Sequence, residues 1–283
     1  MTSYLSPTVA ALYESPGPRA RRRAARLSAL GTAVLLALAA VVVWRFYEQG
    51  QLDARYWYFF VQPTTWAFIW EGLAGTVEVS LAAGALALLL GTAYVSMRVS
   101  RFLPARILGT ALTEFTRSVP ALLFIYLFFL AVPQTGLDLP AFWNITLPVA
   151  ISASGVVSEL LRSGIYSVPR GQVEAALSLG MAPRRVMARI VYPQAFRMVV
   201  PSLIAELVIV VKNTTFAYIV NYPDLMQNAA VLLNNYDSLL SVYLVVAVIY
   251  VLVNFMLNQL SVLCTSFLGG GYGALRLNTS GRA

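Results

Sequence analysis

The sequence predicts an all-α, polytopic membrane protein with about six transmembrane helices. Its 283 residues are 59% hydrophobic and 11% charged, with a mean hydropathy of +0.71, whereas about a quarter of the residues of a soluble domain are charged. Apolar runs long enough to cross a bilayer core of about 30 Å recur along the chain. The basic residues flank these runs instead of covering one polar face, so the formal charge of +8 does not indicate a nucleic-acid partner.

The reactive residues argue against an enzyme. The chain has no histidine, so the usual zinc sites and histidine-activated nucleophiles lack their main ingredient, and no metal site is predicted. Cys264 is the one cysteine and is typical of a small packing residue. No glycine-rich loop precedes Lys212, the one lysine, so the sequence contains no P-loop. We therefore predict no ATP site and no cofactor in this chain.

The chain begins with a basic tail, residues 1–26, followed by an apolar run at 27–44. The arginines of the tail suit contact with anionic lipid headgroups. A cleaved signal peptide is the alternative, because Ala37-Leu38-Ala39 resembles a cleavage site. An uncleaved anchor is favoured, because the run continues to Trp44 and its leading region is long. Together with the aromatic interfacial connection that follows, this extra span occupies residues 27–71.

The predicted core domain occupies residues 72–265, and a C-terminal tail follows at 266–283. Its spans are predicted at residues 72–97, 107–132, 142–165, 199–220 and 239–265. Fifteen arginines lie on one side of these spans, in the two tails and the loops at 98–106 and 166–198, against two, Arg45 and Arg55, on the other. This asymmetry places both termini and the 166–198 loop in the cytoplasm of a cell-membrane protein.

The 166–198 loop is predicted to contain two short helices joined by a turn. Pro169 begins the first helix and Gly180 ends it, while Pro183 begins the second and Pro193 ends it. The first helix is small and apolar and the second is basic, which suits insertion into a groove on a cytoplasmic partner. An ordinary cytosolic loop is the alternative, but it would need neither the capped turn nor two helices.

The same segment resembles the EAA loop of ABC importer permeases. Glu174-Ala175-Ala176, then Gly180, then Ile190-Val191-Tyr192-Pro193 follow that pattern, with Tyr192 where leucine is usual. The resemblance implies a type I importer permease fold, in which this loop is the coupling helix that docks into a cleft of an ATP-hydrolysing subunit. The coupling residues that it implies are Glu174, Ala175, Ala176, Leu177, Gly180, Met181 and Arg184.

Two cations are predicted near the membrane midplane. Arg117 lies about 15 Å and Lys212 about 17 Å into their spans at the helical rise, and ionisable residues at such depth indicate a functional site. Together they would attract an anionic group such as a substrate carboxylate. Glu114 lies three residues before Arg117 and could pair with it instead, an alternative of nearly equal weight. Polar residues that follow Lys212 add hydrogen-bonding capacity, unless the threonines bond their own helix backbone: Asn213, Thr214 and Thr215.

Glu159 and Arg162 form a second pair spaced three residues apart, and Glu206 lies at a similar predicted depth. We interpret these three residues as a structural or gating network, with substrate contact as the less favoured alternative.

Further motifs resemble those of polar amino-acid permeases. The segments are Glu114–Pro120, Ser158–Gln172 and Lys212–Thr215, with Ser118 and Val119 in place of the usual Gly-Thr. The N-terminal extension, with Leu12-Tyr13-Glu14-Ser15-Pro16-Gly17-Pro18-Arg19 and the added span, is similar to that of actinobacterial glutamate importer permeases. The resemblance implies import of a polar amino acid, with glutamate as the leading candidate, by alternating access. The alternatives are glutamine, aspartate or a basic amino acid as substrate, an ATP-independent channel or secondary transporter, and a non-transporting scaffold.

The resemblance also implies the partners. These are a second permease subunit, identical or different, two cytoplasmic ATP-binding subunits and an extracytoplasmic solute-binding protein. Membrane lipid surrounds the chain, the amino-acid substrate passes through it, and the chain performs no bond chemistry itself.

Overall fold

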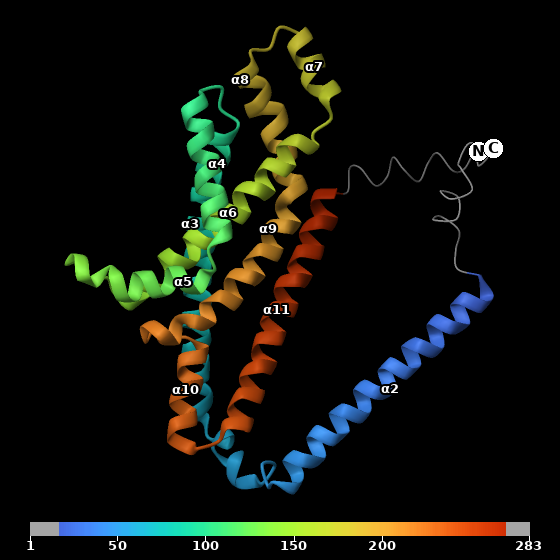
Figure 1. Cartoon of the computed structure of the whole chain (residues 1–283), viewed down its shortest axis with the longest axis vertical. Helices are drawn as coiled ribbons and strands as arrows, with labels where there is room; N and C mark the ends of the chain where they lie inside the picture. The colour runs from blue at the N-terminus through green and yellow to red at the C-terminus, as the bar shows by residue number, and fades with distance from the viewer. Residues whose placement is uncertain (1–16, 270–283) are drawn as a thin grey trace. The chain divides into compact units, whose positions relative to one another are not determined.

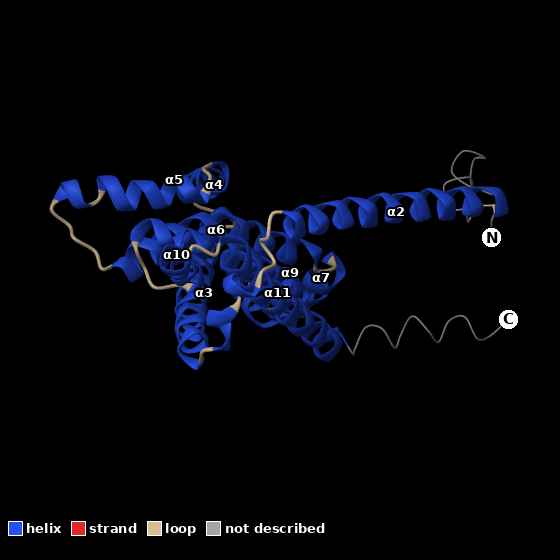
Figure 2. Ribbon diagram, turned by 90° about the horizontal axis from the view of Figure 1, so that it is seen from below, coloured by secondary structure: helices blue, strands red, loops and turns tan. Residues whose placement is uncertain are grey.

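A computed structural model describes residues 17–269, and these residues form helices and loops without a strand (Figure 2). The chain divides after Trp57 into two compact units. Among the described residues, five helices are long and apolar enough to cross a membrane, and a sixth span results if one bent pair of helices is counted. The prediction of an all-α protein with about six spans is therefore confirmed.

The first unit contains the long helix α2, Pro18–Glu48, and the short 3-10 helix η1, Ala54–Tyr56. Pro18 lies at the start of α2, where a missing N–H costs no helical hydrogen bond. None of the most apolar part of α2 is buried within the chain. An exposed apolar helix of this length needs lipid or another protein around it.

The second unit is built from helices of very different length. The long helices are α3 (Pro63–Arg98), α6 (Ala141–Ser167), α9 (Tyr192–Thr214) and α11 (Leu239–Gly269). The shorter α-helices are α4 (Leu103–Ser118), α5 (Ala121–Tyr126), α7 (Arg170–Ser178), α8 (Pro183–Val186) and α10 (Leu225–Tyr236). Short π and 3-10 segments join them: η2 (Tyr58–Val61), η3 (Leu127–Ala131), η4 (Pro133–Thr135), η5 (Met187–Val191) and η6 (Thr215–Val220).

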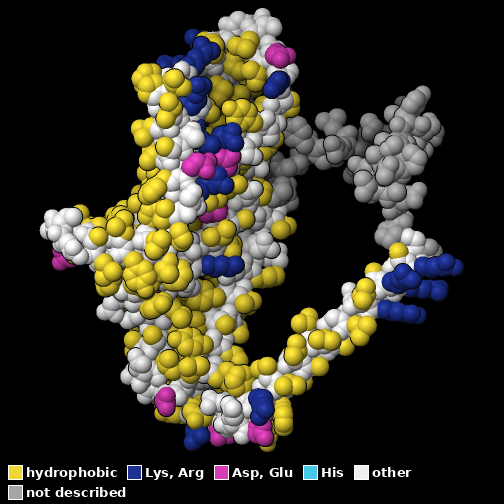
Figure 3. Space-filling view, viewed as in Figure 1, with side chains coloured by type: hydrophobic (Ala, Val, Ile, Leu, Met, Phe, Trp, Pro, Cys, Tyr) yellow, Lys and Arg dark blue, Asp and Glu magenta, His cyan; other side chains and the backbone are white. Residues whose placement is uncertain are grey.

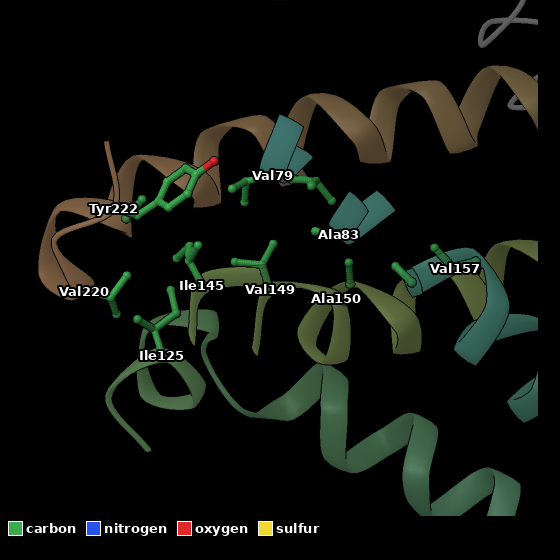
Figure 4. Packing of buried hydrophobic residues seen from close by; sticks show 13 residues of the cluster. Val79, Ala83, Ile125, Ile145, Val149, Ala150, Val157, Val220 and Tyr222 are labelled. Carbon is green, nitrogen blue, oxygen red and sulfur yellow. The ribbon is translucent and has the colours of Figure 1, made fainter. Parts of the chain in front are cut away.

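The core of the second unit lies between α3 and α6. In Figure 4, Val79 and Ala83 of α3 face Ile145, Val149 and Ala150 of α6, and all five side chains are buried. Helix α9 packs against both α3 and α6, and α11 packs against α9. On the face shown in Figure 3, apolar side chains cover much of the middle of the unit, as a bilayer core requires.

The structure corrects the third predicted span, residues 107–132. Helix α4 ends at Ser118, and the segment Ala121–Thr135 continues at an angle of 96° to it (Figure 1). Pro120 causes this break, because proline excludes the helical conformation from the residue before it. Val119 is accordingly extended, with φ −87° and ψ 124°.

Helix α10 is fastened to α3 by buried polar contacts. The Asp224 carboxylate accepts a hydrogen bond from the Gln227 N–H at 2.8 Å and caps α10, while the Thr76 hydroxyl accepts one from the Leu225 N–H at 3.0 Å. The Tyr222 hydroxyl donates to Glu78 at 3.1 Å. Burial raises the pKa of Asp224 to about 6, and burial together with the hydrogen bond to Glu78 raises the pKa of Tyr222 to about 12.

Candidate functional site

The turn between α7 and α8 lies at the opposite end of the second unit from α10 (Figure 1). As predicted, Pro169 precedes the first residue of α7 and Pro183 begins α8. Gly180 has φ +76°, a left-handed conformation that only glycine adopts without strain, and it follows Leu179, the C-cap residue of α7. Its N–H donates to the Leu177 carbonyl at 2.9 Å, and the Met181 N–H donates to the Ala176 carbonyl at 3.2 Å. The glycine at position 180 thus determines how the chain turns from α7 toward α8.

One face of α7 is buried and the opposite face is open. Ala176 packs with Val168, Val186 and Ala195 in a small apolar cluster, which Met181 partly covers. Leu177 and Leu179 remain 43% and 84% exposed. The other exposed residues predicted to act in coupling are Glu174, Ala175, Gly180 and Arg184. The cluster therefore supports a helix whose exposed apolar side chains lack a partner within the described chain.

The second predicted helix does not end at Pro193. Helix α8 continues through the π segment η5 into α9, and Pro193 lies in the first turn of α9. Proline removes one helical N–H and its ring displaces the carbonyl four residues earlier. The wider π turn at Met187–Val191 includes the displaced carbonyl, so the helix continues through this segment instead of stopping.

Arg117 and Glu114 form the ion pair that their spacing predicts. The Arg117 Nη1 lies 3.7 Å from the Glu114 Oε1, and both side chains are substantially exposed. Helix α4 approaches α6 very closely here, because a Cβ atom added at Gly155 would lie 2.7 Å from the Arg117 Cγ. This close approach places Arg117 of α4 against Gly155 of α6.

Lys212 lies near the end of α9 and is exposed. It forms no ion pair within residues 17–269. The Thr214 hydroxyl donates to the Val211 carbonyl at 2.8 Å, and the Thr215 hydroxyl donates to the Lys212 carbonyl at 2.6 Å. Both threonines therefore bond their own helix backbone, which is the alternative to a role in substrate binding. The structure does not join Lys212 directly to Arg117, although α4 and α9 both pack against α6.

Glu159 is held by two arginines. The Arg162 Nη2 and the Arg98 Nη1 each lie 2.7 Å from a carboxylate oxygen of Glu159. From the sequence, Arg98, at the end of α3, is predicted only to flank its span as a basic residue. Its sequence neighbours contain no acidic residue, so local spacing gave no signal for a contact across 61 positions.

Glu206 does not join this pair. Glu206 is 7% exposed, and it has no ion-pair or hydrogen-bond partner within residues 17–269. It lines a cavity of about 300 Å³ between α3, α6 and α9, whose other walls are apolar or glycine: Leu81, Gly84, Ala85, Ala87, Leu88, Val157, Leu203, Leu207 and Val210. Charged side chains of both signs interrupt the apolar surface over α6 and α9 in Figure 3.

An apolar helical body with ionisable groups within its spans and an exposed capped turn suits a membrane permease. Residues 83–264 match the family described as binding-protein-dependent transport system inner membrane components, and the chain belongs to this family. Together with the relatives described next, this match confirms the resemblance to amino-acid ABC importer permeases.

Known relatives and a solved structure agree with this assignment. The chain is 35% identical to the probable glutamine ABC transporter permease protein GlnM of Bacillus subtilis, over 66% of this chain and 87% of that protein. It is 34% identical to the glutamate transport system permease protein GluD of Corynebacterium glutamicum, over 75% of this chain and 79% of that protein. It also matches the crystal structure of an amino acid ABC transporter with histidines, with a TM-score of 0.68 and 27% identity over 72% of this chain and 96% of that one.

Proposed function

We propose that the chain is the membrane-spanning subunit of an ATP-driven importer for a polar amino acid, with L-glutamate as the leading candidate. Family membership supports an importer whose ATPase is a separate subunit. Relatives named for glutamine and glutamate support a polar amino acid as the substrate. Residues 72–265 form the permease core in this proposal, and residues 1–26 and 266–283 are cytoplasmic tails.

The assembly contains two permease subunits, identical or different, and two ATP-binding subunits at the α7–α8 turn. A solute-binding protein delivers the substrate from outside the cell. The two cations act on the substrate carboxylate: Arg117, oriented by Glu114, and Lys212, with the Asn213 amide nearby. Glu159 with Arg162 and Arg98 holds the helices together on the cytoplasmic side of this site.

The observation that carries the proposal is the exposed face of α7 on its rigid support. Leu177 and Leu179 lie in the open while Ala176 anchors the same helix in an apolar cluster. An apolar surface on a firmly held helix suits a protein groove, because little ordering is needed on binding. A movement of the ATPase can then pass through the turn into the spans.

The test replaces Gly180 by aspartate in the complete transporter. The left-handed conformation at this position costs a non-glycine residue about 1 kcal/mol or more, and the carboxylate lies beside the docking face. We expect Gly180→Asp to lower ATP-dependent uptake of L-glutamate at least about tenfold while membrane insertion is preserved.

Gly136→Asp is the matched control. Gly136 also has a positive φ, of +83°, and open space around it, but it lies in the segment between α5 and α6, away from α7. We expect this control to import normally. Normal uptake by Gly180→Asp would contradict coupling through the turn, and uptake that needs no ATPase subunit would favour an ATP-independent transporter.

A further inference from the structure

The cavity beside Glu206 lies at the middle of three spans. Its lining residues fall near the centres of α3 and α9 and in the second half of α6. A volume of about 300 Å³ is at the small end of the range for ligand pockets, about 300 to 1,000 Å³. The cavity therefore suits a ligand the size of an amino acid.

Glu206 is the one charged group in the cavity wall. An uncompensated carboxylate among apolar side chains at membrane depth is costly, so it is retained where a cation or donor completes it. The other acidic residues of α3, α4, α6 and α9 differ from it. Glu114 and Glu159 are paired with arginines, and Glu71 and Glu78 are exposed. Among the acidic residues of these four helices, Glu206 is thus the buried one that lacks a counter-charge. Asp224 is also buried, but it caps α10 and does not line the cavity.

We infer that Glu206 binds the ammonium group of the transported amino acid in this cavity. The inference rests on the proposed function, which makes the ligand a zwitterion. In the proposed function, Arg117 and Lys212 attract its carboxylate at a first site outside the cavity lining. The zwitterion also carries a positive charge, which needs an anionic partner when the ligand leaves that site. Glu206 is available for this role and has free oxygen lone pairs to accept the ammonium hydrogens.

The position of Glu206 makes the cavity a second binding station. Glu206 precedes Lys212 by six residues, which is about 9 Å along α9 at the helical rise. It therefore lies nearer than Lys212 to the end of α9 that continues into η5 and α8. An amino acid that leaves Lys212 toward the coupling turn would meet Glu206 next, and the leucines of the cavity would contact its methylene groups.

The test measures whether Glu206 recognises the ammonium group itself. The permease with its ATPase subunits, in lipid nanodiscs without the solute-binding protein, is equilibrated with radiolabelled L-glutamate or L-glutamine. Glutarate and glutaramate, which lack the ammonium group, serve as competitors, and the unlabelled parent amino acids serve as references. Losing one ion-paired hydrogen bond weakens binding about tenfold to hundredfold, so we expect each analogue to compete that much more weakly with the wild type.

Glu206→Gln keeps the side-chain shape and removes the charge. We expect it to reduce the preference for the amino acid over its analogue to about one, because only ammonium recognition is lost. Glu206→Asp, which keeps the charge, should retain part of the preference, and it serves as the test if Glu206→Gln does not assemble. Glu78→Gln is the control, because Glu78 lies on α3 outside the cavity lining, and it should keep the wild-type preference.

An unchanged preference in Glu206→Gln would overturn the inference, since a lipid chain in the cavity or a purely structural carboxylate would leave the ratio untouched. A wild-type assembly that imports amino acids with ATP but binds none in nanodiscs would overturn it too, and would leave the proposed function standing. A wild-type assembly that imports no polar amino acid would refute the proposed function instead.

Discussion

Glu159→Gln is the substitution expected to loosen the second unit most selectively. The carboxylate joins Arg98 at the end of α3 to Arg162 on α6, with both contacts at 2.7 Å. The Arg98 side chain is 9% exposed and that of Arg162 is 38% exposed. The substitution therefore leaves a buried guanidinium without its counter-charge and a half-exposed one that water can solvate.

The two contacts contribute unequally to stability. A hydrogen bond between charged groups contributes about 1.5 to 3 kcal/mol to stability. Leaving Arg98 without its partner should cost a free energy in this range. The contact of Arg162 is screened by water and contributes about 0.5 kcal/mol. We expect Glu159→Gln to destabilise the folded protein by about 2 to 3 kcal/mol, which corresponds to a fall of several degrees in the midpoint of thermal unfolding.

The assay is thermal unfolding of the purified chain in detergent, with Glu48→Gln as the control. Glu48 pairs with Arg45 at 3.4 Å, but both of these side chains are more than half exposed, so its loss should change stability by less than about 0.5 kcal/mol. A double-mutant cycle of Arg98→Met and Glu159→Gln then isolates their coupling, which should exceed about 1 kcal/mol. A midpoint shift no larger than that of Glu48→Gln, or a coupling near zero, would refute the reasoning.

Two further predictions concern pH and the midplane cations. Burial raises the pKa of Asp224 from 3.8 to about 6, so the folded protein holds this proton more tightly than the unfolded chain does. The binding of this proton therefore contributes about 3 kcal/mol to the stability of the folded protein. The contribution is complete below about pH 4 and is lost as the pH rises to about 6. Asp224→Asn keeps a capping oxygen and should flatten this part of the pH profile of the unfolding midpoint; an equally steep profile would contradict the assignment. Lys212→Ala should weaken substrate-stimulated ATP hydrolysis in the assembled transporter while subunit assembly persists, and an unchanged substrate dependence would remove Lys212 from the site.

The sequence predicted the spans because hydropathy and arginine flanks depend on local composition. It also predicted the capped turn at Gly180, since a left-handed glycine between two proline-marked helices is a local signal. The direction of a helix after a break is not local. Pro120 lies within the run at 107–132 and leaves its hydropathy unchanged, while the 96° bend depends on the packing of α4 and α5 against α6.

The charged groups divide in the same way. Spacing of three residues predicted both pairs that lie on a single helix, Glu114 with Arg117 and Glu159 with Arg162. Arg98 reaches Glu159 only because α3 packs along α6, so the contact depends on tertiary structure. The grouping of Glu206 with Glu159 came from depth alone. Two groups at similar depth on different helices can face different neighbours, and Glu206 faces the apolar cavity.

Continuity at Pro193 changes how the coupling turn would act on the spans. A helix that ended at Pro193 would leave a flexible joint between the turn and α9. In the structure, backbone helix runs from Pro183 through η5 to Thr214, so a displacement of α8 is carried toward Lys212 without crossing a loop. This rod can yield at the π segment and at Pro201, which lies inside α9, because both interrupt the regular pattern of helical hydrogen bonds. We therefore expect the helix to stay continuous from the turn to Lys212 during transport, with its bending concentrated at Met187–Val191 and Pro201.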